Sequence, residues 1–234
     1  MKQLTKLQQL FWYFVIFSII GLLLETIFCY ITTGVLESRK GLIWGPFCPV
    51  YGVGAVVLII LLDQVDQKNY FKLFLYGFLI GAVVEYILSY GLEAVYGTRF
   101  WDYSYTGKDI NGRICILYSL FWGILAILLM KIIRPAIDKI MDKIPKINKT
   151  AQSLLFLFLI IDTLFTIWGI TIYETRAIHE FYQEEMQYSN ISWIRKIEEA
   201  YFSNDRMEKT FPNLRTKDRE GNQVFVRDLI KKSD

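Results

Sequence analysis

The chain has 234 residues, a net charge of +3 and 53% apolar side chains, and its mean hydropathy is +0.31. A soluble domain of this size seldom has a positive mean hydropathy. The near balance of charges does not indicate nucleic-acid binding. The apolar residues are also unevenly spread, since they gather in five blocks at residues 10–32, 47–62, 73–95, 114–133 and 154–173.

Four of these blocks reach the roughly 20 residues that a helix needs to cross the hydrocarbon core of a membrane. The second block is shorter and carries Pro49. We therefore expect an all-α, polytopic transmembrane helical bundle of about five helices. The first block continues through Glu25 without a cleavage site, so we interpret it as a retained helix and not as a signal peptide.

The remaining segments are more polar. Residues 136–178 comprise a basic link and the fifth helix, and residues 179–234 form a polar, amphipathic tail that we expect to be a peripheral appendage. Within this tail, residues 191–202 predict a short amphipathic helix, either at the membrane interface or packed on the bundle, and residues 224–230 predict a strand. The link at 131–149 is rich in Lys and Arg, so the positive-inside rule places it in the cytoplasm together with the N-terminus. With five spans the tail would lie outside.

The first four helices show signs of an internal duplication. A shift of 60 residues pairs Gly21 with Gly81 and Glu25 with Glu85, and a shift of 67 pairs Tyr51 with Tyr118. We therefore expect two tandem, parallel two-helix repeats, at residues 1–66 and 67–135. Parallel repeats of this kind occur in transporters, where the binding site lies between the halves.

Acidic residues lie inside three blocks: Glu25, Glu85 and Asp162. An acid at mid-membrane costs roughly 2.5 to 3.5 kcal/mol, so such residues normally face protein or water. Small and polar residues recur around each acid at helical spacing, which predicts that the three helices meet around a common interior. We interpret that interior as a binding site for a cation, a proton or a small solute.

A purely structural interpretation stays open. Arg39 and Arg99 each follow an acid by fourteen residues and could fold back to pair with it. The same two arginines, with Tyr51 and Tyr118, complete the expected binding residues. Trp101, Asp102 and Tyr103 are expected at the membrane interface, either as aromatic anchors with an ion pair or as a recognition motif for headgroup or substrate.

Other chemistry is not indicated. The three cysteines, Cys29, Cys48 and Cys115, lack metal-like spacing, and no nucleophile, metal or ATP-binding motif is evident. We therefore expect no catalytic residue, no metal and no cofactor. A membrane enzyme that acts on a lipid-like substrate is the weakest alternative, and a non-transporting scaffold or regulatory subunit is the stronger one.

Three segments carry a family resemblance. These are Arg39 to Gly52 around Trp44-Gly-Pro-Phe-Cys-Pro, Arg99-Phe-Trp-Asp-Tyr-Ser, and Phe211-Pro-Asn in the tail. They resemble the CmpB-like family of bacterial membrane proteins, which is named for ABC-transporter type IV permeases. The resemblance implies a permease-like component in the bacterial cytoplasmic membrane, an ATPase on a separate subunit and a possible oligomer. It implies no particular binding residues.

Overall fold

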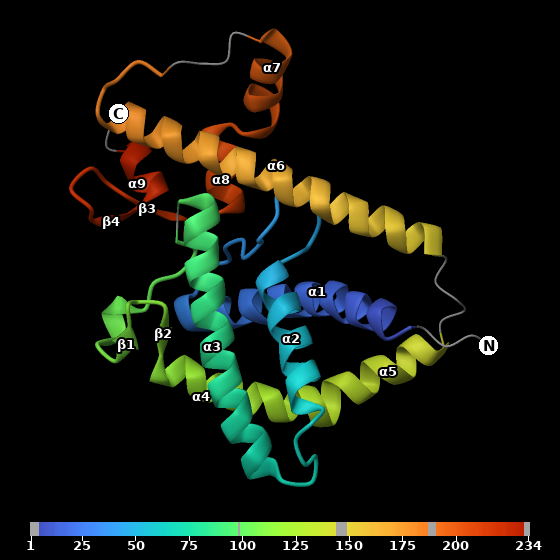
Figure 1. The fold of residues 1–234 in the computed structure, drawn as a ribbon. Coiled ribbons are helices and arrows are strands. Elements are labelled where there is room, and N and C mark those ends of the chain that lie inside the picture. Colours follow the sequence, from blue (N-terminus) through green and yellow to red (C-terminus); the bar gives the residue numbers. More distant parts are fainter. Residues whose placement is uncertain (1–4, 98, 144–148, 187–190, 232–234) are drawn as a thin grey trace.

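The computed structural model describes residues 5–97, 99–143, 149–186 and 191–231. Helices dominate this part of the chain (Figure 1). They are α1 (Lys6–Thr33), α2 (Pro49–Leu62), α3 (Tyr70–Tyr96), α4 (Ile116–Leu128), α5 (Arg134–Lys143), α6 (Lys149–Phe181), α7 (Ser192–Tyr201), α8 (Asn204–Thr210) and α9 (Val226–Lys231). The 3-10 turn η1 (Ser104–Thr106), the π-helical turn η2 (Leu129–Ile133) and two short hairpins, β1 (Asp109–Ile110) with β2 (Ile114–Cys115) and β3 (Arg215–Lys217) with β4 (Gln223–Phe225), complete the list.

The two longest helices of the expected repeats begin and end in the same way. The Thr5 side chain accepts a hydrogen bond from the amide of Gln8 at the start of α1, and Asn69 does the same for Lys72 at the start of α3. Gly34 and Gly97 end these helices with φ of 73° and 74°. Glycine suits this left-handed conformation because it has no Cβ.

Four helices of the described chain are long and apolar enough to cross a membrane: α1, α3, the continuous helix from Ile116 to Asp142, and α6. The all-α, membrane-spanning bundle is therefore confirmed. With 14 residues, α2 extends about 21 Å, which is less than the thickness of the hydrocarbon core. The expected count of five spans, which depends on α2, stays a prediction.

The first four helices form two closely packed pairs, α1 with α2 and α3 with α4. Glycines permit the close approach in both pairs. A Cβ added at Gly52 would overlap Ser18 and Phe14 of α1, and one added at Gly123 would overlap Phe74 of α3. Close packing through small residues is the usual means by which helices associate in lipid, where the hydrophobic effect does not drive them together.

The segment between α1 and α2 is not helical, yet it runs deep between the helices. The amide of Cys48 donates to the carbonyl of Ser18, near the middle of α1, and Leu42 and Phe47 pack with Val15 of α1 and Leu159 of α6. Irregular backbone is tolerated at membrane depth only where protein buries it and satisfies its hydrogen bonds. The helices on either side meet that condition here.

Residues 191–231, which we call the C-terminal cap, pack over one end of the bundle (Figure 1). The cap buries apolar side chains against α6, α3 and the segment before α2. This core consists of Ile43, Tyr96, Ile170, Tyr173, Ala177, Phe202, Met207, Phe211, Leu214, Val226 and Leu229. The tail is therefore packed on the bundle, which is one of the two placements left open for its amphipathic segments, because its scattered apolar residues reach one shared core.

Within the cap, the predicted amphipathic helix is confirmed as α7. The strand expected over 224–230 is only partly correct, because the strand ends at Phe225 and helix α9 follows. Val226 and Leu229 are three residues apart and are both buried in the core of the cap. Helical spacing brings both onto one face, which an extended strand cannot do.

Candidate functional site

Glu25 lies in the C-terminal half of α1, where the side chain of α2 residue Tyr51 reaches it. The Tyr51 hydroxyl donates to Glu25 Oε2 at 2.5 Å. Gly21, one turn earlier on α1, makes this approach possible, because a Cβ at that position would overlap the Cβ and ring of Tyr51. The sequence therefore brings the acid and the phenol together through a glycine contact.

Glu85 occupies the corresponding place on α3 and is buried, with 7% of its surface exposed. Two aromatic donors hold its carboxylate. The Tyr103 hydroxyl donates to Oε1 at 2.8 Å, and the Trp122 indole N–H donates to Oε2 at 3.0 Å. Gly81 lies against Trp122 as Gly21 lies against Tyr51, since a Cβ on Gly81 would overlap the Cβ and ring of Trp122.

These contacts make Trp122, and not Tyr118, the counterpart of Tyr51. Tyr118 instead stacks on Tyr103, with ring centroids 4.6 Å apart. We did not expect Trp122 among the site residues. The sequence contains a pattern that points to Trp122. A shift of 71 residues, in place of 67, pairs Tyr51-Gly52 with Trp122-Gly123 and Ala55 with Ala126.

The two acids also share a neighbour. Tyr103 precedes η1 in the loop between α3 and α4. Burial raises the pKa of the Tyr103 hydroxyl, and the carboxyl groups of Glu85 and Glu25 raise it further. One phenol thus lies within electrostatic reach of both acids.

Asp162 makes different contacts. It is fully buried in α6, and its Oδ1 accepts from the amide of Trp44 at 3.2 Å and from the Thr166 hydroxyl at 3.5 Å. The Thr166 hydroxyl in turn accepts from the amide of Ile43 at 3.0 Å. Asp162 therefore holds the irregular segment before α2, and its hydrogen bonds do not join it to Glu25 or Glu85.

The arginines expected to pair with the acids have other partners. Arg39 contacts Glu37 at 3.4 Å, and Arg99 contacts Glu93 at 2.8 Å. In the described part of the chain, no ion pair includes Glu25, Glu85 or Asp162. The donors at Glu25 and Glu85 are aromatic and neutral.

Trp101, Asp102 and Tyr103, which we call the interface motif, connect the loop after α3 to the rest of the molecule. The indole N–H of Trp101 donates to the carbonyl of Arg113 at 3.1 Å, and Asp102 pairs with Arg215 of the cap at 3.4 Å. Burial alone would raise the pKa of Asp102, but hydrogen bonds from Ser104 and the charges of Arg215 and Arg99 hold this pKa below its usual value. The three residues of the motif therefore have different roles. Tyr103 contacts Glu85, whereas Trp101 holds the loop and Asp102 pairs with the cap.

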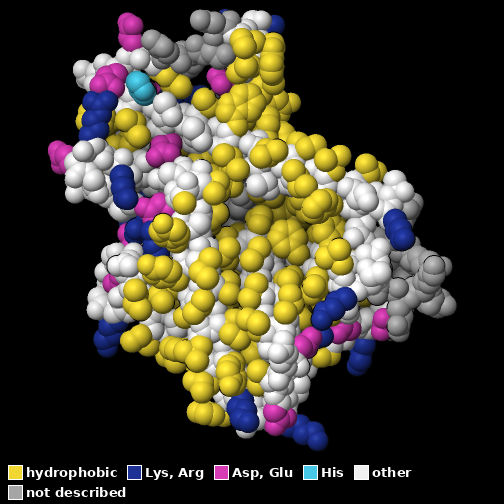
Figure 2. All heavy atoms as spheres, viewed as in Figure 1, with side chains coloured by type: hydrophobic (Ala, Val, Ile, Leu, Met, Phe, Trp, Pro, Cys, Tyr) yellow, Lys and Arg dark blue, Asp and Glu magenta, His cyan; other side chains and the backbone are white. Residues whose placement is uncertain are grey.

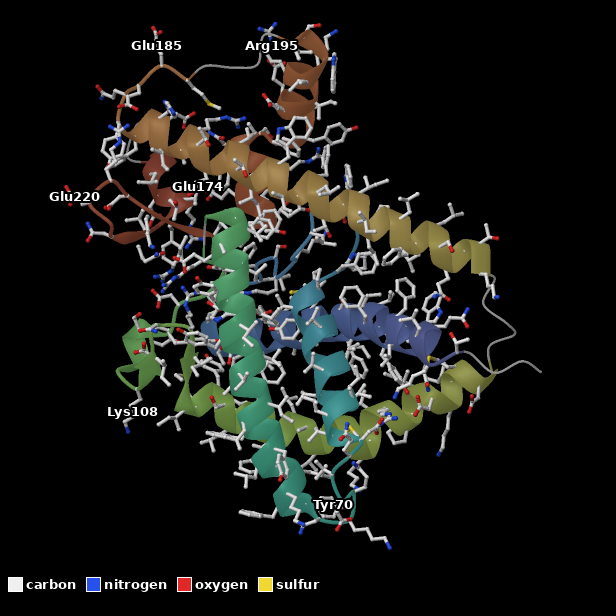
Figure 3. All side chains as sticks on the ribbon, in the orientation of Figure 1. Tyr70, Lys108, Glu174, Glu185, Arg195 and Glu220 are labelled. Carbon is white, nitrogen blue, oxygen red and sulfur yellow. The ribbon has the colours of Figure 1, made fainter. Side chains whose placement is uncertain are left out.

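A second ionic cluster lies beside this motif at the end of α3. Glu93 contacts Arg99, Arg113 and Lys217 at 2.8, 2.6 and 3.1 Å. Figure 3 shows Glu174 of α6 on the side that faces the cap, where it accepts a hydrogen bond from Thr216. Charged groups at this end of the bundle therefore connect α3, α6 and the cap.

The described residues contain no group of three or more His, Cys, Asp or Glu side chains that could hold a metal ion. Glu25, Glu85 and Asp162 lie on three different helices, each with its own set of donors. A metal centre therefore has no donor set in this part of the chain.

The comparison with protein families agrees with this membrane architecture. The family model described as "Putative ABC-transporter type IV" matches residues 12–167, which is more than half of the chain. The chain belongs to this family. The matched region contains Glu25, Tyr51, Glu85, Trp122 and Asp162 and ends before the cap. No curated protein and no solved structure matches the chain. Family and fold together identify a multi-pass membrane protein of an ABC-transporter type.

Proposed function

We propose that the protein is a permease-like subunit of a transporter, and that Glu25 and Glu85 bind a proton, a cation or a small cationic solute. One observation carries the proposal. Both carboxyl groups lie on apolar helices and accept hydrogen bonds only from aromatic O–H and N–H groups among the described residues. Ionisable groups at membrane depth usually mark a transport path.

The neutral partners explain why a ligand would be favoured. A buried carboxylate without an ion-pair partner loses its hydration, and neutral hydrogen bonds recover only part of that free energy. A bound cation or proton removes the uncompensated charge. Had Arg39 and Arg99 paired with the acids, no ligand would be needed, but these arginines contact Glu37 and Glu93 instead.

The helix pairs suggest how the site is built. The Gly21–Tyr51 contact of one pair resembles the Gly81–Trp122 contact of the other, as tandem, parallel repeats would require. In transporters with parallel repeats the site lies between the halves. We include Tyr103 and Trp122 in the site, and we assign Asp162 to the support of the segment before α2.

The proposal extends to the cellular setting. The family is named for ABC transporters, so ATP would be hydrolysed on a separate subunit. We place the chain in the bacterial cytoplasmic membrane with its N-terminus inside, because the basic link at 131–149 is then cytoplasmic. That link is the expected docking region for the ATPase, with anionic lipid headgroups as the other candidate.

The test is ion flux into proteoliposomes that contain the full chain. Proton flux is followed with trapped pyranine and monovalent-cation flux with a thallium-sensitive dye. We expect Glu25→Gln and Glu85→Gln each to lower the wild-type flux at least tenfold while the protein remains folded. Glu199→Gln, on an exposed part of the cap, is the control and should have no effect. Unchanged flux in both site variants would favour a non-transporting scaffold.

A further inference from the structure

Helix α7 differs from the rest of the cap because it leaves large apolar side chains uncovered. Ile191, Trp193 and Tyr201 are 49%, 61% and 40% exposed. No other large apolar side chain of the described cap is exposed to this degree. A water-soluble domain would normally bury such a group of side chains, and larger exposed apolar patches mark interaction sites.

The sides of α7 have distinct character. At 100° per residue, Ile194, Ile197 and Glu198 fall on the side that is turned toward the protein, which agrees with their lower exposure. Trp193 and Ala200 fall next to one another on the exposed surface, and Arg195 and Glu199 pair at 3.8 Å on the opposite exposed edge. The uncovered surface of the helix therefore has an apolar edge, formed by Trp193 and Ala200, and a charged edge, formed by Arg195 and Glu199, with Lys196 between them.

The exposed apolar surface of α7 continues onto α6. The ring of Tyr201 lies 5.8 Å from Phe165 of α6 and 6.2 Å from Trp44, measured between centroids. On α6 itself, Ile160, Ile161 and Leu164 are 42%, 50% and 62% exposed. Figure 2 shows hydrophobic side chains over α7 that join those over α6. Since α6 spans the membrane, its uncovered apolar side chains face lipid.

We propose that α7 lies in the membrane interface and rests its Trp193 side on lipid. The helix has ten residues, too few to span, and Trp and Tyr favour the depth of the headgroups. Its two basic residues, Arg195 and Lys196, are balanced by Glu198 and Glu199, so a zwitterionic bilayer suffices. Figure 3 shows Arg195 at the outer edge of α7, where its charged group can stay in water. The cap is thus attached to the bilayer in addition to the bundle.

Nitroxide accessibility in lipid nanodiscs tests this inference directly. The full chain, with Cys29, Cys48 and Cys115 replaced by Ser, is placed in phosphatidylcholine nanodiscs and labelled at one new cysteine. We expect the label at Trp193→Cys to collide with oxygen and to be shielded from a nickel chelate. The label at Glu199→Cys, the control, should be accessible to the nickel chelate.

Two outcomes would overturn the proposal. If both labels are accessible to the nickel chelate, α7 is in water. If the label at position 193 is shielded from both reagents, another protein surface covers it. Ala200→Cys lies on the same side as Trp193 and replaces a small side chain, so it gives the same readout should the tryptophan substitution disturb folding. The assay measures no transport, so its result does not depend on the proposed function.

Discussion

Gly81→Ala probes the packing that positions Glu85 and its indole donor. A Cβ at this position would overlap the Cβ and Cγ of Trp122, and the backbone of α4 fixes the position of that Cβ. The helices must therefore separate or the indole must move. Overpacking of this kind costs about 1 to 3 kcal/mol. Alanine also gains about 1 kcal/mol over glycine in a helix, which offsets part of that cost.

Gly91→Ala is a matched control on the same helix. No atom lies within 4 Å of a Cβ built at Gly91, so alanine there should have only the propensity gain. That gain is common to both variants and cancels in their difference. We therefore expect the free energy of unfolding of Gly81→Ala to be about 1 to 3 kcal/mol below that of Gly91→Ala.

The assay is reversible unfolding in mixed micelles, with sodium dodecyl sulfate as the denaturant and far-ultraviolet circular dichroism as the signal. Indole fluorescence of Gly81→Ala should also change if Trp122 moves away from Glu85. Equal free energies of unfolding for the two variants would refute the reasoning, because they would mean that α3 and α4 are not in close contact at Gly81.

Two further variants test the supporting contacts. Asp162→Ala should lower the free energy of unfolding by about 1 to 3 kcal/mol, because it leaves the amide of Trp44 without its acceptor. Asp162→Asn keeps an oxygen at this place and should lower the free energy of unfolding by less. Equal losses in the two variants would show that the hydrogen bond from the Trp44 amide to residue 162 is absent. The pKa of Asp102 is lower in the folded protein than in the unfolded chain, where it is ~3.9. The pairing of Asp102 with the cap therefore stabilises the protein fully at pH values above the unfolded pKa. This stabilisation is lost as the pH falls through the folded pKa. Limited proteolysis with pepsin should therefore release the cap more readily toward the acid end of this range. Asp102→Asn should weaken this pH dependence without abolishing it, because the pairing of Glu93 with Lys217 of the cap remains. Cleavage that is independent of pH in the wild type would contradict the assignment.

The sequence was sufficient to predict the helices and the acids that they carry. Long apolar blocks with Glu25, Glu85 and Asp162 inside them indicate membrane helices, because the cost of an acid in lipid leaves few other solutions. The glycines that precede Glu25 and Glu85 by four residues also indicated where helices meet. Periodicity and composition are local properties, so they can be read from the chain alone.

The partners of these acids could not be predicted in the same way. Trp122 reaches Glu85 only because the loop after α3 sets where α4 begins, and the expected shift of 67 residues placed Tyr118 there instead. Asp162 was expected beside the other acids, but a backbone amide of an irregular segment takes its Oδ1. Ile43 and Phe202 share one core although 158 positions separate them. Contacts of this range depend on loop geometry, which no local pattern encodes.

The central claim is that Glu25 and Glu85 face one interior, and a double-mutant cycle on the free energy of unfolding tests it without knowledge of the substrate. Glu25→Gln, Glu85→Gln and the double variant are compared with the wild type in lipid bicelles. Because Tyr103 interacts electrostatically with both acids, we predict a coupling free energy of about 0.5 kcal/mol or more. Strictly additive effects would mean that the two acids occupy separate sites and would contradict the claim.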